Sequence, residues 1–365
     1  MVKASIIITS YNNLHNLEEC LKSLINQNYD RNLIDLEMII VDSGSTDNSI
    51  EILDKYKEKI KVILKPSHLP RLSPAIARNI GVQNSKGDIL IFSDSDCIFP
   101  SDWVKDMIAS FKNPQIDCVI GSREPDVGQG LGTFIRRYDF ILYSNKFSIQ
   151  KAIIINKRGL QEDTPFVLMA GNNFAIKKEV WNKLGGMRTV FKHPAGEDIM
   201  LEIELIKSSY NFLFNPRSKV IHIHPVSLIK VFQKAFQNGE ATYFLSKYSN
   251  NFVNWRHFAQ RGHIFNLKSL LLNILLIVSL LLIVALLKLP LLIKLIGLFV
   301  LFLIILTNRL IGLRNKLDLI LNSKGEEYKR IYKTSLFQLF HFNIIHFLLK
   351  STALISFLWT FLIRK

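Results

Sequence analysis

The stretch SIIITSYNN, Ser5 to Asn13, joins a short apolar run to a series of small polar residues. About thirty residues later MIIVDSGSTDNS, Met38 to Ser49, repeats this arrangement. Continuous apolar runs of this length are typical of strands buried on both faces, as in a parallel sheet. Parallel strands end at one common edge of their sheet, where ligands bind. We therefore expect Thr9, Tyr11 and Asp42 to lie together at that edge.

Strands and helices alternate through the first 225 residues. Helical patterns are predicted over residues 16–27 and 74–85, and strands over residues 4–9, 36–41, 61–65 and 88–94. This alternation predicts an α/β fold with a mostly parallel sheet covered by helices. The Leu- and Ile-rich final third predicts an α-helical membrane domain after it.

Two carboxylates follow the strand predicted over residues 88–94, in the sequence FSDSDC. Asp94 and Asp96 would repel each other at this edge unless a cation neutralised them. A divalent cation carrying a diphosphate meets that need, and oxygen ligands favour Mg²⁺ or Mn²⁺. The alternative is a solvated turn that contains two Asp residues.

Six motifs between Ser5 and about Pro225 resemble the inverting family 2 glycosyltransferases with the GT-A fold. They are SIIITSYN, IIVDSGSTDNS, PAIARNIGVQNSKGDILIFSDSDC, MAGNNFAIKKEVWNKLGGM, GEDIML and VIHIHP. The resemblance implies a GT-A (Rossmann-like) fold and a nucleotide-diphosphate sugar as donor. It also implies Mg²⁺ or Mn²⁺ as cofactor and transfer with inversion at the anomeric carbon.

The resemblance assigns a nucleotide-sugar site and a metal site to particular residues. The nucleotide-sugar site consists of Thr9, Tyr11, Asp42, Arg78, Asp94 and Asp96, and the metal site of Asp94, Asp96 and His222. Thr9 and Tyr11 would line the base pocket, and Asp42 would accept a hydrogen bond from the base or ribose. Arg78 would pair with the diphosphate, although a surface helix charge is the alternative. Asp47 is expected to cap the helix that starts near Asn48.

The motif GEDIML supplies the expected catalytic residues, with Asp198 as general base and Glu197 beside it. Both fall in the first turn of a predicted helix, where the helix dipole would favour the ionised carboxylates. Acidic residues are also common at helix starts without any catalytic role. Members of the family often have EDxDLxxR, whereas this chain has Met200 and Glu204 at the second Asp and the Arg. Acceptor contacts are therefore expected to differ.

Other residues leave two interpretations open. His222 would complete the metal shell, but a structural or acceptor-side histidine fits equally, and His224 is the weaker candidate. The aromatic-rich stretch Phe134 to Phe147 would face the acceptor or belong to a core helix. Three separated cysteines without a CxxC pair are expected to be small buried hydrophobic residues; they are Cys20, Cys97 and Cys118.

Two apolar segments of nearly membrane-spanning length predict a hairpin, residues 269–287 and 291–307. A further segment near residues 336–363 would be embedded or interfacial. Basic residues flank the hairpin on both sides, so the prediction is a multi-pass protein of the cell membrane with its catalytic domain on the cytoplasmic side. Buried core helices are the alternative. Between the two parts, residues 226–267 would hold an amphipathic interfacial helix and linker, or a helix packed on the first domain.

These patterns predict three regions: a GT-A domain over residues 1–225, the linker region 226–267 and a membrane domain over 268–365. The leading expectation is a membrane-attached glycosyltransferase that contacts membrane lipids and uses a lipid-linked glycan or polyprenyl phosphate as acceptor. A nucleotidyltransferase is a weaker alternative, because the first strand lacks a GxGxR loop. The net charge of +16 suggests a noncatalytic scaffold or nucleic-acid binder as another alternative. The basic residues, however, largely flank apolar segments, where membrane topology explains them. No nucleic-acid partner is expected.

Overall fold

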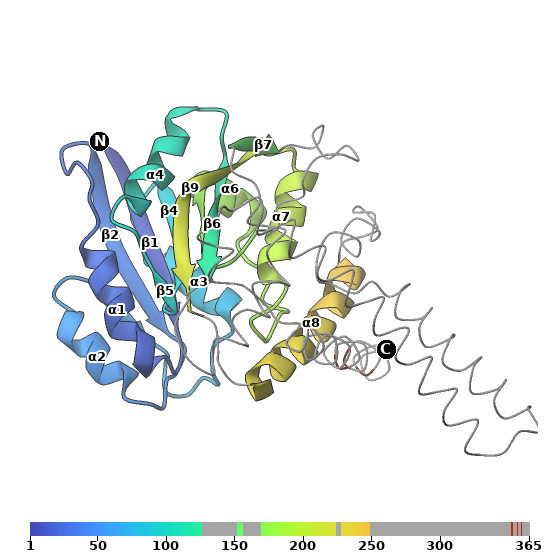
Figure 1. Ribbon diagram of the computed structural model, residues 1–365. Coiled ribbons are helices and arrows are strands. Elements are labelled where there is room, and N and C mark those ends of the chain that lie inside the picture. The colour runs from blue at the N-terminus through green and yellow to red at the C-terminus, as the bar shows by residue number, and fades with distance from the viewer. Residues whose placement is uncertain are drawn as a thin grey trace, which may run out of the picture. The chain divides into compact units, whose positions relative to one another are not determined.

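The computed structural model describes residues 1–125, 152–155, 169–223 and 228–248, together with the single residues 352, 356 and 359. The chain falls into two compact units. The first contains all the described strands, the helices that precede residue 225, and the last helix from Ala241 onward. The sheet and the candidate site both belong to this unit (Figure 1).

Four parallel strands form the first half of the sheet, as the apolar runs predict. They are β1 (Val2–Ser10), β2 (Ile34–Asp42), β3 (Lys61–Leu64) and β4 (Ile89–Asp94), in the spatial order β3-β2-β1-β4. In their register Ser10 lies opposite Asp42, and Thr9 lies opposite Asp94. The polar strand ends therefore meet at one edge.

The second half of the sheet is mixed, which differs from the mostly parallel sheet expected. Its strands are β5 (Cys97–Ile98), β6 (Cys118–Pro125), β7 (Ile153–Ile155), β8 (Phe174–Lys177) and β9 (Phe212–His222). Strand β8 pairs antiparallel with both β4 and β6, whereas β6 and β9 run parallel. A short apolar run looks the same in either direction, so the sequence does not reveal which way β8 runs.

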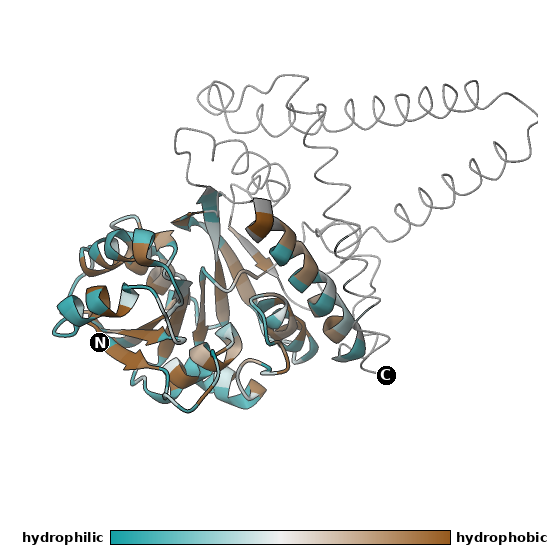
Figure 2. Cartoon of the chain, turned by 90° about the horizontal axis from the view of Figure 1, so that it is seen from below, coloured by the Kyte–Doolittle hydropathy of each residue, from teal (hydrophilic) through white to brown (hydrophobic). Residues whose placement is uncertain are grey.

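Helices cover both faces of the sheet (Figure 1). One face carries α1 (Leu14–Ile25), α2 (Ser49–Tyr56) and α4 (Trp103–Ala109), followed by the short helix η1 (Ser110–Lys112). The other carries α3 (Pro74–Gln83), α6 (Lys178–Leu184) and α7 (Glu197–Lys207). Figure 2 shows apolar strands inside and hydrophilic colour on the outer surfaces of the helices.

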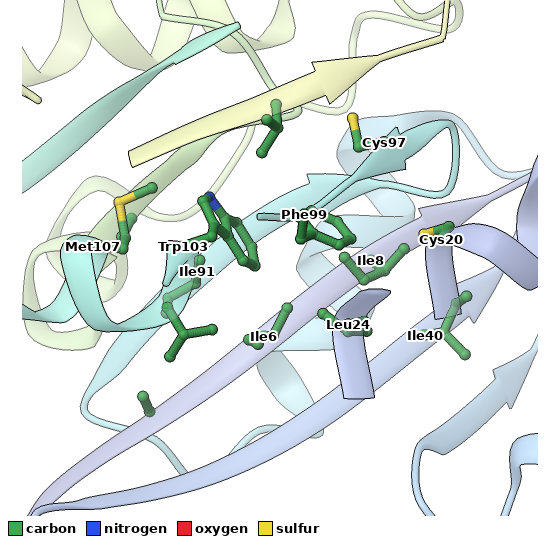
Figure 3. Close-up of a cluster of buried hydrophobic side chains, with 14 of the residues drawn as sticks. Ile6, Ile8, Cys20, Leu24, Ile40, Ile91, Cys97, Phe99, Trp103 and Met107 are labelled. Carbon is green, nitrogen blue, oxygen red and sulfur yellow. The ribbon is translucent and has the colours of Figure 1, made fainter. Parts of the chain in front are cut away.

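Strand β1 shows how the sequence divides its side chains between the two faces. Ile6 and Ile8 belong to the cluster under α1 and α4, which Figure 3 shows, and Ile7 belongs to the cluster on the opposite face. Successive side chains of a strand point to opposite faces, and all three are fully buried. Each such side chain contributes roughly 1.5–3 kcal/mol of burial energy. The apolar run is thus a strand covered on both sides.

Helix α8 (Leu228–Tyr248) confirms the helix predicted at the start of the linker region. From Ala241 on it belongs to the first unit, where the Phe244 ring centroid lies 6.0 Å from that of Phe191. This end of the helix therefore packs on the domain, as the second interpretation has it. The three segments expected in or on a membrane, residues 269–287, 291–307 and 336–363, lie outside the described ranges.

Within the described part of the chain, no helix is both apolar and long enough to cross a bilayer. Helix α8 has 21 residues, but Lys230, Lys234, Glu240 and Lys247 interrupt its apolar positions, and a spanning helix needs about 20 predominantly apolar residues. This finding contradicts the predicted multi-pass location in the cell membrane with a cytoplasmic catalytic domain, and that prediction is corrected.

Candidate active site

Direct hydrogen bonds join the ends of β1 and β4. The Thr9 hydroxyl donates to Asp94 Oδ1 at 2.6 Å, and the Ser95 N–H donates to the Thr9 carbonyl at 3.0 Å. Asn13, just before α1, donates from its side chain to the Ser95 carbonyl at 2.7 Å. The turn that carries Asp94 and Asp96 is therefore held to the edge formed by β1.

Arg78 lies at the centre of the site and is only 2% exposed. Its Nη2 donates to Asp94 Oδ1 and its Nη1 to Glu197 Oε1, both at 2.9 Å. Burial opposes the charged guanidinium, but the carboxylates outweigh burial and raise the pKa of Arg78. The alternative of a surface helix charge is wrong. Two of its N–H groups are already bound by carboxylates, so Arg78 links α3 to β4 and α7.

Glu197 and Asp198 open helix α7, but only Glu197 is deeply buried. Burial, and then the neighbouring Asp198, raise the pKa of Glu197 to about 7 against the opposing effect of Arg78. Arg78 also pairs with Asp94, which explains why its ion pair with Glu197 at 2.9 Å does not keep the pKa of Glu197 low. Burial therefore outweighs the helix dipole, contrary to the expectation that both carboxylates are favoured in their ionised form.

The Asp198 carboxylate is held from the neighbouring segment. The Gly171 N–H donates to Asp198 Oδ2 at 2.9 Å. Gly171 also packs against Arg78, since a Cβ at residue 171 would lie 2.5 Å from Arg78 Nη2. A residue without a side chain lets the backbone approach both groups. Gly171 thus contacts both the guanidinium of Arg78 and the carboxylate of Asp198.

The structure places His222 beside Asp96, with Nε2 at 3.3 Å from Asp96 Oδ2. Asp96, Cys97 and His222 bring their ligand atoms within 4.8 Å of one another. Asp94, two positions before Asp96, is not one of these three; its Oδ1 accepts from the Thr9 hydroxyl and from Arg78 Nη2. The Asp96 oxygen and the His222 nitrogen are ligand atoms suited to a divalent cation. The residues therefore fit the expected cofactor. His224 and the stretch Phe134 to Phe147 lie outside the described residues.

Comparisons with known proteins agree with this geometry. The model of the family "Glycosyl transferase family 2" matches residues 5–185. These residues form a glycosyltransferase domain of family 2. Over 151 residues the chain is 30% identical to Glycosyltransferase AglE of Haloferax volcanii, covering 40% of this chain and 48% of the relative. Over 211 residues the chain is 28% identical to a dolichol-phosphate mannosyltransferase of Pyrococcus furiosus, covering 58% of this chain and 54% of the relative.

These matches span about half of each relative's length. Among solved structures, the mannosyltransferase PcManGT from Pyrobaculum calidifontis, in complex with GDP-Man and Mn²⁺, has a TM-score of 0.58. It is 17% identical, and the likeness covers 98% of this chain and 87% of that one. At this identity the comparison shows the fold, which is the GT-A type that the motifs imply. The expectation of a family 2 glycosyltransferase is thus confirmed for the domain.

Asp42 of the glycosyltransferase domain lies at the predicted edge but is 1% exposed. Its Oδ1 accepts from the N–H groups of Gly44 and Ser45 at 2.9 and 2.8 Å, and its Oδ2 accepts from the Ser45 hydroxyl at 2.6 Å. Gly44 adopts a φ of +100°, which glycine tolerates and which lets the turn close on Asp42. Asp42 therefore shapes the turn after β2, and contact with a base or ribose stays a prediction.

Two contacts near Tyr11 and Asp47 complete this edge. The guanidinium carbon of Arg71 lies 3.6 Å from the centroid of the Tyr11 ring, a cation–π arrangement. Asp47 Oδ1 accepts from the Ser49 N–H at 3.1 Å, as its predicted capping role requires. Its Oδ2 accepts from the Leu14 N–H at 3.0 Å, so one carboxylate serves the starts of α1 and α2.

Three residues near the site carry no predicted role: Arg71, Gly171 and Asn173. Asn173 is fully buried, and its side chain bonds Trp103 Nε1 at 2.9 Å and the carbonyls of Ser122 and Ser218 at 2.6 and 2.8 Å. The signal for two of them was present in the run AGNNF, because adjacent small and amide residues before an apolar strand indicate close backbone approach. No comparable signal marks Arg71.

Proposed function

We propose that this chain transfers a sugar from a nucleotide-diphosphate donor to an acceptor oxygen, with inversion at the anomeric carbon and with dependence on a divalent cation. The observation that carries the proposal is the buried bridge from Asp94 through Arg78 to Glu197. It joins the edge expected to bind the donor to the helix turn expected to carry the base. The bridge would thereby hold both halves of a transfer reaction together.

The donor would lie along the edge formed by the ends of β1, β2 and β4. Thr9, Tyr11 and Asp42 would face the nucleoside, as the family resemblance implies. Asp94, Asp96 and His222 would hold Mg²⁺ or Mn²⁺, which when bound neutralises charge on the departing nucleoside diphosphate. Without a cation, Asp94 and Asp96 would repel the diphosphate.

Asp198 is better suited than Glu197 to accept the acceptor proton. A general base must be ionised, and burial raises the pKa of Glu197 to about 7. Glu197 is also engaged by Arg78 through Oε1, whereas Asp198 is less buried and is oriented by the Gly171 N–H. We assign Asp198 as base and Glu197 as the group that holds Arg78 beside it.

For the acceptor we propose a polyprenyl phosphate or a lipid-linked glycan. Support comes from the named activity of a relative, the dolichol-phosphate mannosyltransferase of Pyrococcus furiosus. The departures at Met200 and Glu204 set this chain apart from the family's usual helix pattern. Glu204 instead accepts from Arg188 Nε at 2.7 Å, so its carboxylate pairs α7 with the segment that precedes it.

The test is a panel of nucleotide sugars incubated with the full chain and Mn²⁺, with release of nucleoside diphosphate as readout. One donor should turn over, and Asp198→Asn should reduce its transfer by roughly 10²- to 10⁴-fold while donor binding persists. Glu51→Gln is a matched control, because Glu51 also lies in the first turn of a helix but is exposed. Near-normal turnover by Asp198→Asn would place the base elsewhere.

A further inference from the structure

A buried thiol lies beside two of the groups expected to hold the cation. Cys97 opposes His222 in the antiparallel pair of β5 and β9, and directly opposed side chains point to the same face of a sheet. Cys97 Sγ lies 3.8 Å from Asp96 Oδ1. Cys97 is a buried member of the cluster that contains Ile8 and Phe99, and Figure 3 shows its sulfur turned away from both. The thiol is thus placed at the site as well as at the core.

The three side chains supply one oxygen, one sulfur and one nitrogen ligand within 4.8 Å of one another. In a tetrahedral zinc site, bonds of about 2.1 Å to nitrogen and 2.3 Å to sulfur separate those two atoms by roughly 3.6 Å. Small side-chain movements are enough to close such a shell. Sulfur ligands select soft cations, whereas Mg²⁺ and Mn²⁺ prefer oxygen.

We propose that Asp96, Cys97 and His222 form a binding site for a thiophilic divalent cation, such as Zn²⁺ or Cd²⁺, that excludes Mn²⁺ or Mg²⁺ from the active site. Asp96 and His222 would serve either cation, so the two cations cannot be held together. When the soft cation binds, a metal–sulfur bond forms and the S–H proton passes to the solvent, with no change in oxidation state. Competition rests on the proposed function, whereas binding of the soft cation does not.

The consequence is a reaction that soft cations inhibit. A tetrahedral cation bound by Asp96, Cys97 and His222 would have room for one further ligand, whereas Mn²⁺ and Mg²⁺ accept several oxygens in octahedral geometry. A diphosphate that needs two of its oxygens coordinated would be poorly served by the tetrahedral ion. Selectivity between cations would then depend on Cys97.

The experiment is a titration of the full chain with Cd²⁺ alone, followed by the ultraviolet sulfur-to-metal charge-transfer absorption. The expected result is saturation at one equivalent in the wild type. In Cys97→Ala the band should disappear and the Cd²⁺ affinity should fall by at least roughly 10- to 100-fold. Cys118→Ala is the matched control, because that thiol is equally buried in strand β6 and should leave the band intact.

A second variant, Cys97→Ser, and the melting temperature of each protein separate ligand loss from misfolding. The Mn²⁺ affinity of Cys97→Ala should fall less than its Cd²⁺ affinity. An unchanged band in Cys97→Ala, or no band in the folded wild type, would overturn the site. Unaltered Mn²⁺-dependent transfer in the presence of saturating Cd²⁺ would overturn the competition. The titration needs no turnover, so a failure of the proposed transfer reaction would be recognised separately.

Discussion

Arg78→Met tests the buried bridge, because methionine keeps an unbranched apolar side chain and removes the guanidinium. Arg78 is 2% exposed and binds Asp94 and Glu197 at 2.9 Å each. Removing one partner of a buried ion pair costs about 3–5 kcal/mol, since the remaining charge is left uncompensated. We expect the free energy of unfolding to fall by that amount at pH 8.

The loss should be smaller at pH 6. Without Arg78, the pKa of Glu197 would rise further above its value of about 7, because Arg78 is the largest of the influences that lower it. Protonation then relieves part of the penalty, by up to about 1.4 kcal/mol for each pH unit and proton. Unfolding by urea at both pH values measures this, with tryptophan fluorescence as signal. Trp103 and Trp181 both report on the core.

Two comparisons make the result decisive. Arg188→Met removes an ion pair of 2.7 Å to Glu204, in which the Arg188 side chain is 55% exposed and the Glu204 side chain 10%, so it should cost less than Arg78→Met. The double variant Arg78→Met/Glu197→Gln should recover at least about 1 kcal/mol relative to the sum of the single changes. An Arg78→Met cost equal to that of Arg188→Met, or strict additivity in the double variant, would refute the bridge.

Two further predictions concern the same cluster. The raised pKa of Glu197, about 7 against an ordinary 4.5, contributes stability that is present below pH 4.5 and is lost as the pH rises through about 7. At about 1.4 kcal/mol per pKa unit this amounts to on the order of 3 kcal/mol. In urea unfolding with chelator present, the free energy of unfolding of Glu197→Gln should not show this fall with pH. A pH profile equal to that of the wild type would contradict the prediction. Gly171→Ala places a Cβ 2.5 Å from Arg78 Nη2. We therefore expect thermal unfolding to show a loss of about 1–3 kcal/mol of stability, together with slower transfer. A variant as stable and active as the wild type would contradict this packing.

The parallel half of the fold could be predicted because its signals are local. Runs such as Ile6 to Ile8 are apolar on every residue, and Pro74 follows Ser73, whose hydroxyl accepts from the Ile76 N–H at 3.4 Å. The apolar run indicates a buried strand, and Ser73 followed by Pro74 indicates a helix start. The polar ends of β1, β2 and β4 then follow from the rule that parallel strands end at one edge. Strand β8 gave no comparable sign of its antiparallel direction.

The central side chains could be selected from the motifs, but their environments could not. Arg78 occurs in a helix with an ordinary pattern, and its partner Glu197 lies 119 residues further along the chain. Only the tertiary fold brings them together and removes water from both. The same burial reverses the helix-dipole argument for Glu197, because desolvation of a carboxylate exceeds the dipole's effect in the first turn. Local sequence determines which groups are present, and packing determines their protonation.

The cation-dependent binding of a nucleoside diphosphate tests the central claim most directly. Calorimetry of UDP and of GDP with the full chain should show binding of one of them in Mn²⁺ and at least a tenfold weaker affinity, about 1.4 kcal/mol, in excess chelator. The reason is that Asp94 and Asp96 repel a diphosphate unless a cation lies between them. Equal affinity with and without chelator would contradict the account, because the carboxylate edge would then have no role in holding a metal-bound donor.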